Sequence, residues 1–367
     1  MSDMPIDLKS RRRTRRRYLA MVVFVLALIG GWSAFWWYAS GRAAEVIADW
    51  RTHEAAAGRV FGCGSQDIAG YPFRIEVTCR PVTAEFRNFS PPLDVRLPRI
   101  LVAAQIYQPT LLCSEFDGPV SIGGAGATPE FEANWTLGQS SVRGLAATPQ
   151  RVSLVFDAPE IDHVAGGKRD VWLKAQHLEL HGRVAAPSAD DKGGIETALR
   201  VQQASLPGLH PAATRPIDAT IDTVLRGVTD FSPKPWKVRF RELQAAGGRI
   251  EVPQARVSQG DILAVGNGAL TLTAGGHLDG QIQVTVAGLE QVLDEIGAKQ
   301  MVQSSPAMDK LAGALDRLAP GLGNAAREQL SSNIGAGINA LGQQTTLEGR
   351  PAVALPLRFE DGAMFLG

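Results

Sequence analysis

Apolar and polar residues alternate with a period of two over most of this chain. The alternation recurs between residues 59 and 287 and returns near the end, with its clearest runs at 73–80, 217–226, 281–286 and 353–359. Because successive side chains of a strand point to opposite faces, each run predicts a β-strand with one apolar and one polar face. A shorter alternation, in which Val238 and Phe240 lie between basic residues, predicts a further strand over 237–241.

Turn-forming residues separate these runs, as at Gly118-Pro119, Gly193-Gly194 and Gly247-Gly248. Alternating strands that are joined by tight turns form antiparallel sheets with one solvated and one apolar face. No long helical pattern lies between successive strands, which argues against a doubly wound parallel sheet. We therefore predict a mainly β protein: one large curved antiparallel sheet, a groove or half-barrel, over residues 59–287, with closing strands over 344–367.

Helical periodicity is predicted only near the C-terminus. Four apolar residues have the spacing of one helix face: Leu289, Val292, Leu293 and Ile296. Further helices are predicted over 305–318 and 330–341, so that residues 288–343 form a C-terminal helical segment. These few helices are too small to cover the whole sheet. Its curvature, a partner or lipid must cover the remaining apolar surface.

An uncharged apolar segment, residues 18–38, follows a run of six arginines. As a helix its 21 residues extend roughly 31 Å, close to the ~30 Å hydrocarbon core of a bilayer. The basic flank predicts an N-terminus that stays in the cytoplasm. Four aromatic residues near the other end suit the opposite membrane interface: Trp32, Trp36, Trp37 and Tyr38.

We accordingly predict a basic cytoplasmic tail over residues 1–17, one transmembrane helix over 18–40 and a helical stalk over 41–58. The alternatives are a cleaved signal peptide, a twin-arginine export signal and a buried helix of a soluble protein. The apolar run is longer than that of a signal peptide, and bulky aromatic residues precede the only cluster of small ones. Nothing on the segment is polar enough to face water. A single uncleaved anchor is therefore the favoured interpretation.

The distribution of charge follows the same division. The chain is neutral overall, with 37 basic and 37 acidic residues. Residues 1–42 contain eight basic and two acidic residues, or +6, which leaves 29 basic against 35 acidic residues, or −6, beyond them. A mildly acidic exported part offers no basic surface for nucleic acid, so membrane orientation explains the arginine run.

The three cysteines, Cys63, Cys79 and Cys113, all lie beyond the apolar segment. In an oxidising compartment a disulfide is expected wherever the geometry allows one. Cys63 and Cys79 flank a turn sequence, and closing such a ~15-residue loop contributes about 3 kcal/mol. We favour a Cys63–Cys79 disulfide, which leaves Cys113 as a buried free thiol or as a rival partner for Cys79.

No segment carries a recognisable catalytic, metal or cofactor motif. The turn Gly70-Tyr71-Pro72-Phe73 is interpreted as structural, because Pro72 fixes φ at the start of a strand. His177 and His181 share one face of a predicted strand with Glu179, but no third metal ligand is arranged nearby in the sequence. The serines show no Gly-x-Ser-x-Gly elbow. We predict a protein without catalytic residues, metal or cofactor.

Several of these features resemble one known family. The basic start, the single anchor, the Ala-rich stalk with Trp50 and the segments Gly62-Cys63-Gly64 and Gly70-Tyr71-Pro72-Phe73-Arg74 resemble the bacterial family called domain of unknown function 2125. The resemblance covers nearly the whole chain. Residues 268–282 also resemble, more weakly, C-terminal repeats of AsmA-like envelope proteins, which are β-rich, inner-membrane-anchored periplasmic proteins of Gram-negative bacteria linked to phospholipid traffic. These resemblances imply a bacterial inner-membrane anchor with the bulk of the chain in the periplasm, and neither family supplies catalytic residues.

Two functional hypotheses follow. In the first, the chain is a non-catalytic envelope protein whose apolar groove binds phospholipid or other acyl chains, because each buried methylene contributes roughly 0.8 kcal/mol. The candidate groove residues are Ile221, Phe240, Ile282 and Val284. The alternative is an envelope scaffold that binds another protein through a sheet edge or through its C-terminal helices. An envelope hydrolase is a third hypothesis, which no sequence motif supports.

Overall fold

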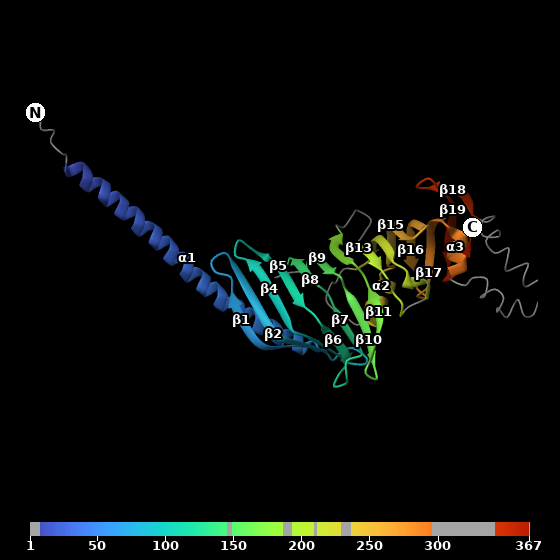
Figure 1. Ribbon diagram of the computed structural model, residues 1–367, viewed down its shortest axis with the longest axis horizontal. Coiled ribbons are helices and arrows are strands. Elements are labelled where there is room, and N and C mark those ends of the chain that lie inside the picture. Colours follow the sequence, from blue (N-terminus) through green and yellow to red (C-terminus); the bar gives the residue numbers. More distant parts are fainter. Residues whose placement is uncertain are drawn as a thin grey trace, which may run out of the picture.

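The protein is described here by a computed structural model, which covers residues 8–144, 149–185, 193–208, 211–228, 236–295 and 342–366. All twenty described strands belong to one sheet, and a long N-terminal helix extends from one end of it (Figure 1). The predicted mainly β class, with one large antiparallel sheet, few helices and an apolar N-terminal helix, is confirmed.

The described helices are α1 (Leu8–Ala56), α2 (Trp236–Ala245) and α3 (Leu289–Glu295), with a 3-10 turn at Pro211–Thr214. The strands, in chain order, are β1 (Arg59–Ala69), β2 (Arg74–Phe86), β3 (Leu93–Leu97), β4 (Arg99–Gln105), β5 (Gln108–Asp117), β6 (Val120–Gly124), β7 (Phe131–Asn134), β8 (Leu137–Arg143), β9 (Arg151–Asp157), β10 (Glu160–Ala165), β11 (Lys168–Lys174), β12 (His177–Ala185), β13 (Gly194–Ala204), β14 (Ile217–Arg226), β15 (Arg249–Gln259), β16 (Ile262–Leu272), β17 (Leu278–Ala287), β18 (Gln343–Leu347), β19 (Arg350–Glu360) and β20 (Ala363–Leu366).

The sheet is a meander in which strands that follow one another in the chain lie side by side. From β1 and β2 the antiparallel pairing continues through β4, β5, β8, β9 and β12 to β17, and then to β19. A shorter branch pairs β2 with β3 and then passes through β6, β7 and β10 to β11. The two branches form one sheet because five long strands are each divided into two consecutive halves. These halves are β3 and β4, β5 and β6, β7 and β8, β9 and β10, and β11 and β12.

Each of these long strands is interrupted near its middle. The register continues across the interruption between β8 and β7, but it shifts by one residue at the interruption between β5 and β6. Leu137 of β8 opposes Asp157 of β9, and beyond the interruption Asn134 of β7 opposes Glu160 of β10. Three of the interruptions contain a proline, which has no N–H to donate to the ladder: Pro98, Pro119 and Pro159. The assignment of side chains to the two faces therefore continues from β8 and β9 into β7 and β10, but not from β5 into β6.

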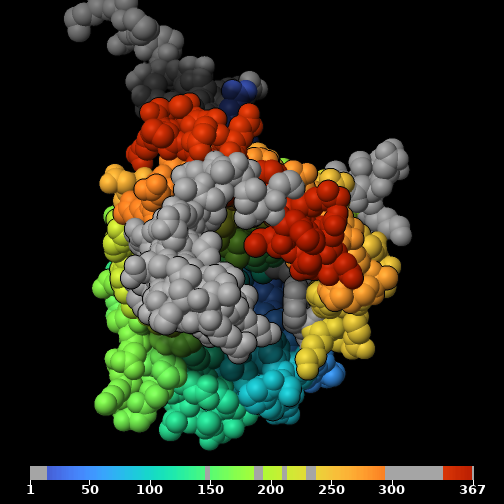
Figure 2. Space-filling view, turned by 90° about the vertical axis from the view of Figure 1, so that its right-hand side faces the viewer, coloured from blue at the N-terminus to red at the C-terminus, as the bar shows by residue number. Residues whose placement is uncertain are grey.

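The sheet is open at both ends. Among the described strands β1 pairs only with β2, and the far side of β19 carries the short strands β18 and β20. Figure 2 shows the molecule along its long axis, where the coloured parts of the chain surround a hollow. The predicted curvature of the sheet is visible in this view.

Helix α1 contains the segments predicted as anchor and stalk in one uninterrupted element. Its part Arg15–Ala56 is long and apolar enough to cross a membrane, with a mean hydropathy of 2.1 in its most apolar stretch, and it is the single such helix in the described chain. After α1 the chain reverses, and β1 lies along the second half of the helix (Figure 1). There Trp50 stacks on Phe61 with ring centroids 4.8 Å apart.

The strand predicted over 237–241 is wrong, because these residues belong to helix α2. Two alternating apolar residues are too few to define a strand. Phe240 and Leu243 are instead three residues apart, the spacing of one helix face, and Leu243 is buried. A helix therefore also occurs between strands β14 and β15, and not only near the C-terminus.

Of the C-terminal helical segment predicted over 288–343, the structure describes α3 and the start of β18. The helices predicted over 305–318 and 330–341 lie outside the described residues. The closing strands predicted over 344–367 correspond to β18, β19 and β20. Both β18 and β20 pair with β19, which pairs with β17 on its other side.

Few large side chains are fully buried in this sheet. Among the described residues Leu263 is the one large side chain less than 2% exposed, and it clusters with Ala287 and Ala352. Leu347 packs against this cluster, which lies where β16, β17 and β19 meet. A twenty-stranded sheet with so small a sealed core leaves most of its apolar side chains partly open.

We expect Leu263→Ala to lower the free energy of unfolding by about 2–5 kcal/mol, because truncating a fully buried side chain leaves a cavity. Leu199→Ala, at a half-buried position of β13, should lower it clearly less. Denaturant titration of the full-length protein in detergent measures both values. Equal losses would mean that Leu199 lies in a sealed core, contrary to the fold described here.

Candidate functional site

The strand registers align apolar residues into rows that cross the sheet. One row, which we call the Ile221 row, consists of directly opposed residues in twelve strands from β2 to β19. Its members are Val77, Val102, Ser114, Ser140, Leu154, Leu180, Leu199, Ile221, Ala255, Gly266, Val284 and Leu355. Opposed residues point to the same face of a sheet, so this row marks one face throughout. At a strand spacing of about 4.8 Å it extends for about 50 Å.

A second row on the same face contains no polar side chain. This Val201 row lies two residues along the strands and is followed from β8 to β19. Its members are Gly138, Phe156, Leu178, Val201, Ala219, Val257, Ala264, Val286 and Val353. Together the two rows define what we call the apolar face of the sheet.

The opposite face carries the buried cluster of Leu263, Ala287 and Ala352 in strands β16, β17 and β19, and it is polar further along the sheet. In strands β12 to β15 its opposed residues are Glu179, Arg200, Thr220 and Arg256. Arg200 also forms an ion pair with Asp222, with 2.8 Å between the guanidinium and carboxylate atoms. These groups are solvated and paired, so this part of the face needs no further cover.

The apolar face is incompletely covered. Leu180 of the Ile221 row is 39% exposed, and Val184 and Ile250, which lie further along on the same face, are each 38% exposed. Of the described helices, α1 packs on β1 and α3 on β16. The strands between them have no comparable helical cover within the described residues, so the middle of the face is accessible to a ligand.

Side chains converge on this face around Gly138. The rings of Phe116 and Phe156 are stacked with centroids 6.5 Å apart, although strand β8 separates β5 from β9, so that their backbones lie about 9.6 Å apart in an extended sheet. Trp135 occupies the space above Gly138, where a Cβ would lie 2.4 Å from its indole nitrogen. Its N–H donates to the carbonyl of Phe116 at 2.8 Å. Glycine at position 138 is therefore required for this aromatic cluster.

The structure brings together three of the four residues predicted for the groove. Ile221 and Val284 belong to the same row, and Ile282 lies two residues along β17 on the same face, opposed to Gly268 and Leu357. Phe240 is not on a strand: it lies on α2, with its ring beside Gly276 in the turn between β16 and β17. Leu180, Leu199 and Leu355 were not among the residues predicted for the groove, because their alignment depends on registers between strands.

A group of titratable residues on the polar face is centred on His177. The ring nitrogens of His177 lie 2.5 Å from a carboxylate oxygen of Asp157 and 2.8 Å from one of Glu179, and His181 lies 3.1 Å from Glu179. The hydrogen bonds to Glu179 and Asp157 raise the pKa of His177 above its ordinary value. The hydrogen bonds of His177 and His181 lower the pKa of Glu179. Among the described residues no group of three or more His, Cys, Asp or Glu side chains is arranged to hold a metal ion.

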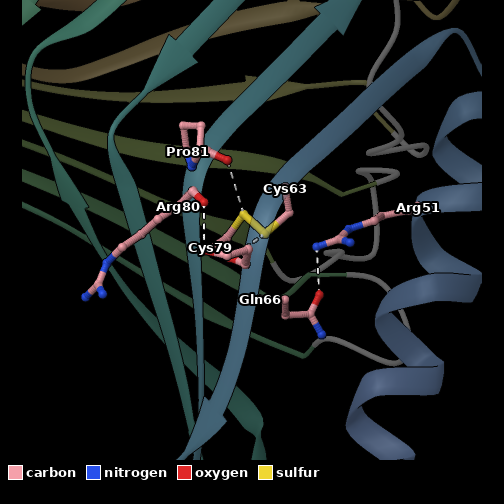
Figure 3. The surroundings of a disulfide bond; sticks show 7 residues. Arg51, Cys63, Gln66, Cys79, Arg80 and Pro81 are labelled. Carbon is pink, nitrogen blue, oxygen red and sulfur yellow. Dashed lines mark hydrogen bonds between the residues drawn. A yellow bond between two sulfur atoms is a disulfide. The ribbon is translucent and has the colours of Figure 1, made fainter.

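Cys63 and Cys79 form a disulfide between β1 and β2, with an S–S distance of 1.98 Å and a Cα–Cα distance of 5.6 Å (Figure 3). Beside it Arg51 of α1 donates a hydrogen bond to Gln66 of β1 at 2.9 Å. Cys113 is a free thiol, but the expectation that it is buried is wrong, because it is exposed. It is opposed to Ala103 and lies in β5 next to Ser114, a member of the Ile221 row, so it points to the other face.

These features define a β-rich protein with one N-terminal helix that is apolar enough for membrane anchoring and with a sheet whose apolar face is not sealed. The chain belongs to the family described as "Uncharacterized protein conserved in bacteria (DUF2125)", whose model matches residues 36–367. This confirms the family predicted from the Gly-Tyr-Pro-Phe-Arg turn and its surroundings. A comparison with curated proteins gives no match. The weaker resemblance to AsmA-like proteins stays an expectation.

Folding stability should depend on pH through His177. Because its pKa is raised in the folded protein, its stabilising contribution is complete below its ordinary pKa of about 6.5 and is lost as the pH rises through the raised value. We therefore expect His177→Gln to lower the melting temperature more at about pH 6 than at about pH 9. Thermal unfolding followed by circular dichroism checks this. An equal or larger loss at the higher pH would contradict the assignment.

Proposed function

We propose that this protein is a non-catalytic, membrane-anchored protein of the bacterial envelope, and that its apolar face binds acyl chains of phospholipid or a similar lipid. The observation that carries the proposal is the continuity of the Ile221 row and the Val201 row across the sheet, with no helix over their middle in the described chain. Val286, Val353 and Leu355 at one end of the rows are buried, but Leu180 in their middle is 39% exposed. Exposed apolar surface is costly unless a ligand or partner covers it.

The dimensions of the face support a lipid ligand. The Ile221 row is about 50 Å long, which exceeds the ~30 Å thickness of a bilayer's hydrocarbon core. Burying each methylene of an acyl chain contributes roughly 0.8 kcal/mol, so even partial cover binds a long chain. The β-branched and leucine side chains of the two rows offer no hydrogen bonds to specific groups, which favours a ligand with long saturated segments.

Three further observations support the cellular setting that we propose. Helix α1 is apolar enough to span a membrane, and its six N-terminal arginines favour the cytoplasmic side for the N-terminus. The disulfide between Cys63 and Cys79 suits an oxidising compartment such as the periplasm. We infer an inner-membrane protein with a single span and most of its chain in the periplasm.

Native mass spectrometry of gently extracted full-length protein tests the lipid proposal. We expect wild-type protein to retain phospholipid and Ile221→Glu to lose most of it, because the substitution puts a charge into the apolar face. Thr220→Glu is the matched control: it is the adjacent residue of β14, on the polar face between Arg200 and Arg256, and should retain lipid.

Circular dichroism must first show that both variants keep their strand content. Wild-type protein without lipid, or equal lipid loss in the two folded variants, would contradict the proposal.

One observation favours a scaffold function as the second candidate. Among the described strands, β11 pairs with β10 on one side, and on its other side it makes only the single bridge between Lys174 and Ser205. Val171 and Trp172 on this strand are 39% and 43% exposed. Such an edge accepts an added strand from a protein partner. A stoichiometric partner that is lost with Val171→Pro, in protein that carries no lipid, would favour this function.

A further inference from the structure

The turn between β1 and β2 is attached to helix α1 by side chains of the helix. The indole N–H of Trp32 donates to the carbonyl of Pro72 at 2.9 Å, and that of Trp36 donates to the carbonyl of Arg74 at 2.9 Å. The hydroxyls of Ser33 and Tyr71 are 2.9 Å apart, and the rings of Trp36 and Tyr71 meet edge to face at 5.6 Å. These contacts fix the turn at one level of the helix.

That level lies within the segment predicted to cross the membrane. The uncharged segment ends at Tyr38, and Trp36 and Trp32 precede this residue by two and six positions. At 1.5 Å per residue, the attached turn therefore lies about 3–9 Å inside the end of the segment. This is the depth at which amphipathic groups occupy the boundary between headgroups and acyl chains, about 5–10 Å into the membrane.

The backbone carbonyls of the turn have hydrogen-bond partners, as an apolar environment requires. The carbonyls of Gly70, Pro72, Phe73 and Arg74 each accept a hydrogen bond: from the Arg74 N–H, from Trp32, from the Ile106 N–H and from Trp36. Pro72 has no N–H to satisfy. Irregular backbone is tolerated at membrane depth only when its polar groups have partners, and the four carbonyls of this segment have them.

The exposed side chains of the turn are those that favour a membrane interface. Tyr71 is 52% and Phe73 is 63% exposed. The neighbouring turn between β4 and β5, joined to Phe73 through Ile106, presents Tyr107 at 75% exposure. Aromatic residues are enriched at both interfaces of a membrane. Arg74, the charged residue that begins β2 directly after this turn, pairs with Glu76 at 2.7 Å and is long enough to reach the headgroups.

We propose that the β1–β2 and β4–β5 turns insert Tyr71, Phe73 and Tyr107 into the lipid interface of the same bilayer that α1 spans. The first strands of the sheet are thereby held against the membrane, and the Ile221 row begins at β2, next to the lipid. The bilayer itself covers the aromatic patch formed by Tyr71, Phe73 and Tyr107. The hydrogen bonds from Trp32 and Trp36 to the turn fix the depth of this patch in the membrane. The inference rests on membrane anchoring by α1 and is independent of lipid binding by the apolar face.

Site-directed spin labelling of the full-length protein in phosphatidylethanolamine–phosphatidylglycerol vesicles tests the proposal. Cys113→Ser removes the free thiol while the Cys63–Cys79 disulfide is kept, and a single cysteine then replaces Phe73. Phe89 is the matched control, because it is an exposed phenylalanine in the turn at the opposite end of β2. We expect the ratio of accessibility to oxygen over that to a water-soluble nickel chelate to be several-fold higher at position 73 than at 89.

Two further label positions keep the outcome interpretable. A label at position 107 repeats the measurement if Phe73→Cys disturbs the turn, and a label at position 26 reports the centre of the predicted span. High oxygen accessibility at 26 with equal nickel accessibility at 73, 107 and 89 would overturn the insertion of the turns alone. High nickel accessibility at 26 as well would overturn both the insertion and the membrane anchor. Neither result depends on whether lipid is bound to the apolar face.

Discussion

The structure depends on one constraint, which is the antiparallel register that keeps the Ile221 row and the Val201 row on one face, although individual strand pairs contain local register shifts. A slip of one residue would move every side chain of a strand to the other face. The long strands are interrupted at their middles, yet pairs such as Leu137–Asp157 and Asn134–Glu160 show that the alternation continues across an interruption. This alignment turns short alternating segments of sequence into a row about 50 Å long, which carries apolar residues or glycine except at Ser114 and Ser140.

The same constraint accounts for the small core. Because the strands follow one another as a meander, the sheet has no second described sheet to pack against, and its sealed cluster around Leu263 is confined to the region of β16, β17 and β19. Elsewhere, backbone pairing, cross-strand contacts and ion pairs on the polar face stabilise the sheet, while residues such as Leu180 stay partly exposed. A face of this kind gains stability from an apolar ligand that covers it.

Sequence patterns predicted the class of fold because strict alternation, as in residues 217–226, is hard to reconcile with any element but a two-faced strand. Alternation failed at Phe240, where two apolar residues fit either period and burial of Leu243 decides for a helix. The functional face was predicted only in part. Ile221, Ile282 and Val284 were recognised from the alternation within their own strands. Their alignment with Leu199 and Leu355 is set by pairings between residues distant in the chain, which cannot be read from one sequence.

Photo-crosslinking in intact membranes tests most directly whether the apolar face is occupied by lipid. A benzophenone amino acid placed at Leu199, in the middle of the Ile221 row, would be compared with the same group at Arg200, the next residue on the polar face. We expect mass spectrometry after irradiation to find lipid adducts at position 199 and few at position 200. Adducts at neither position, or at both positions equally, would contradict the assignment of the apolar face as a lipid-binding surface.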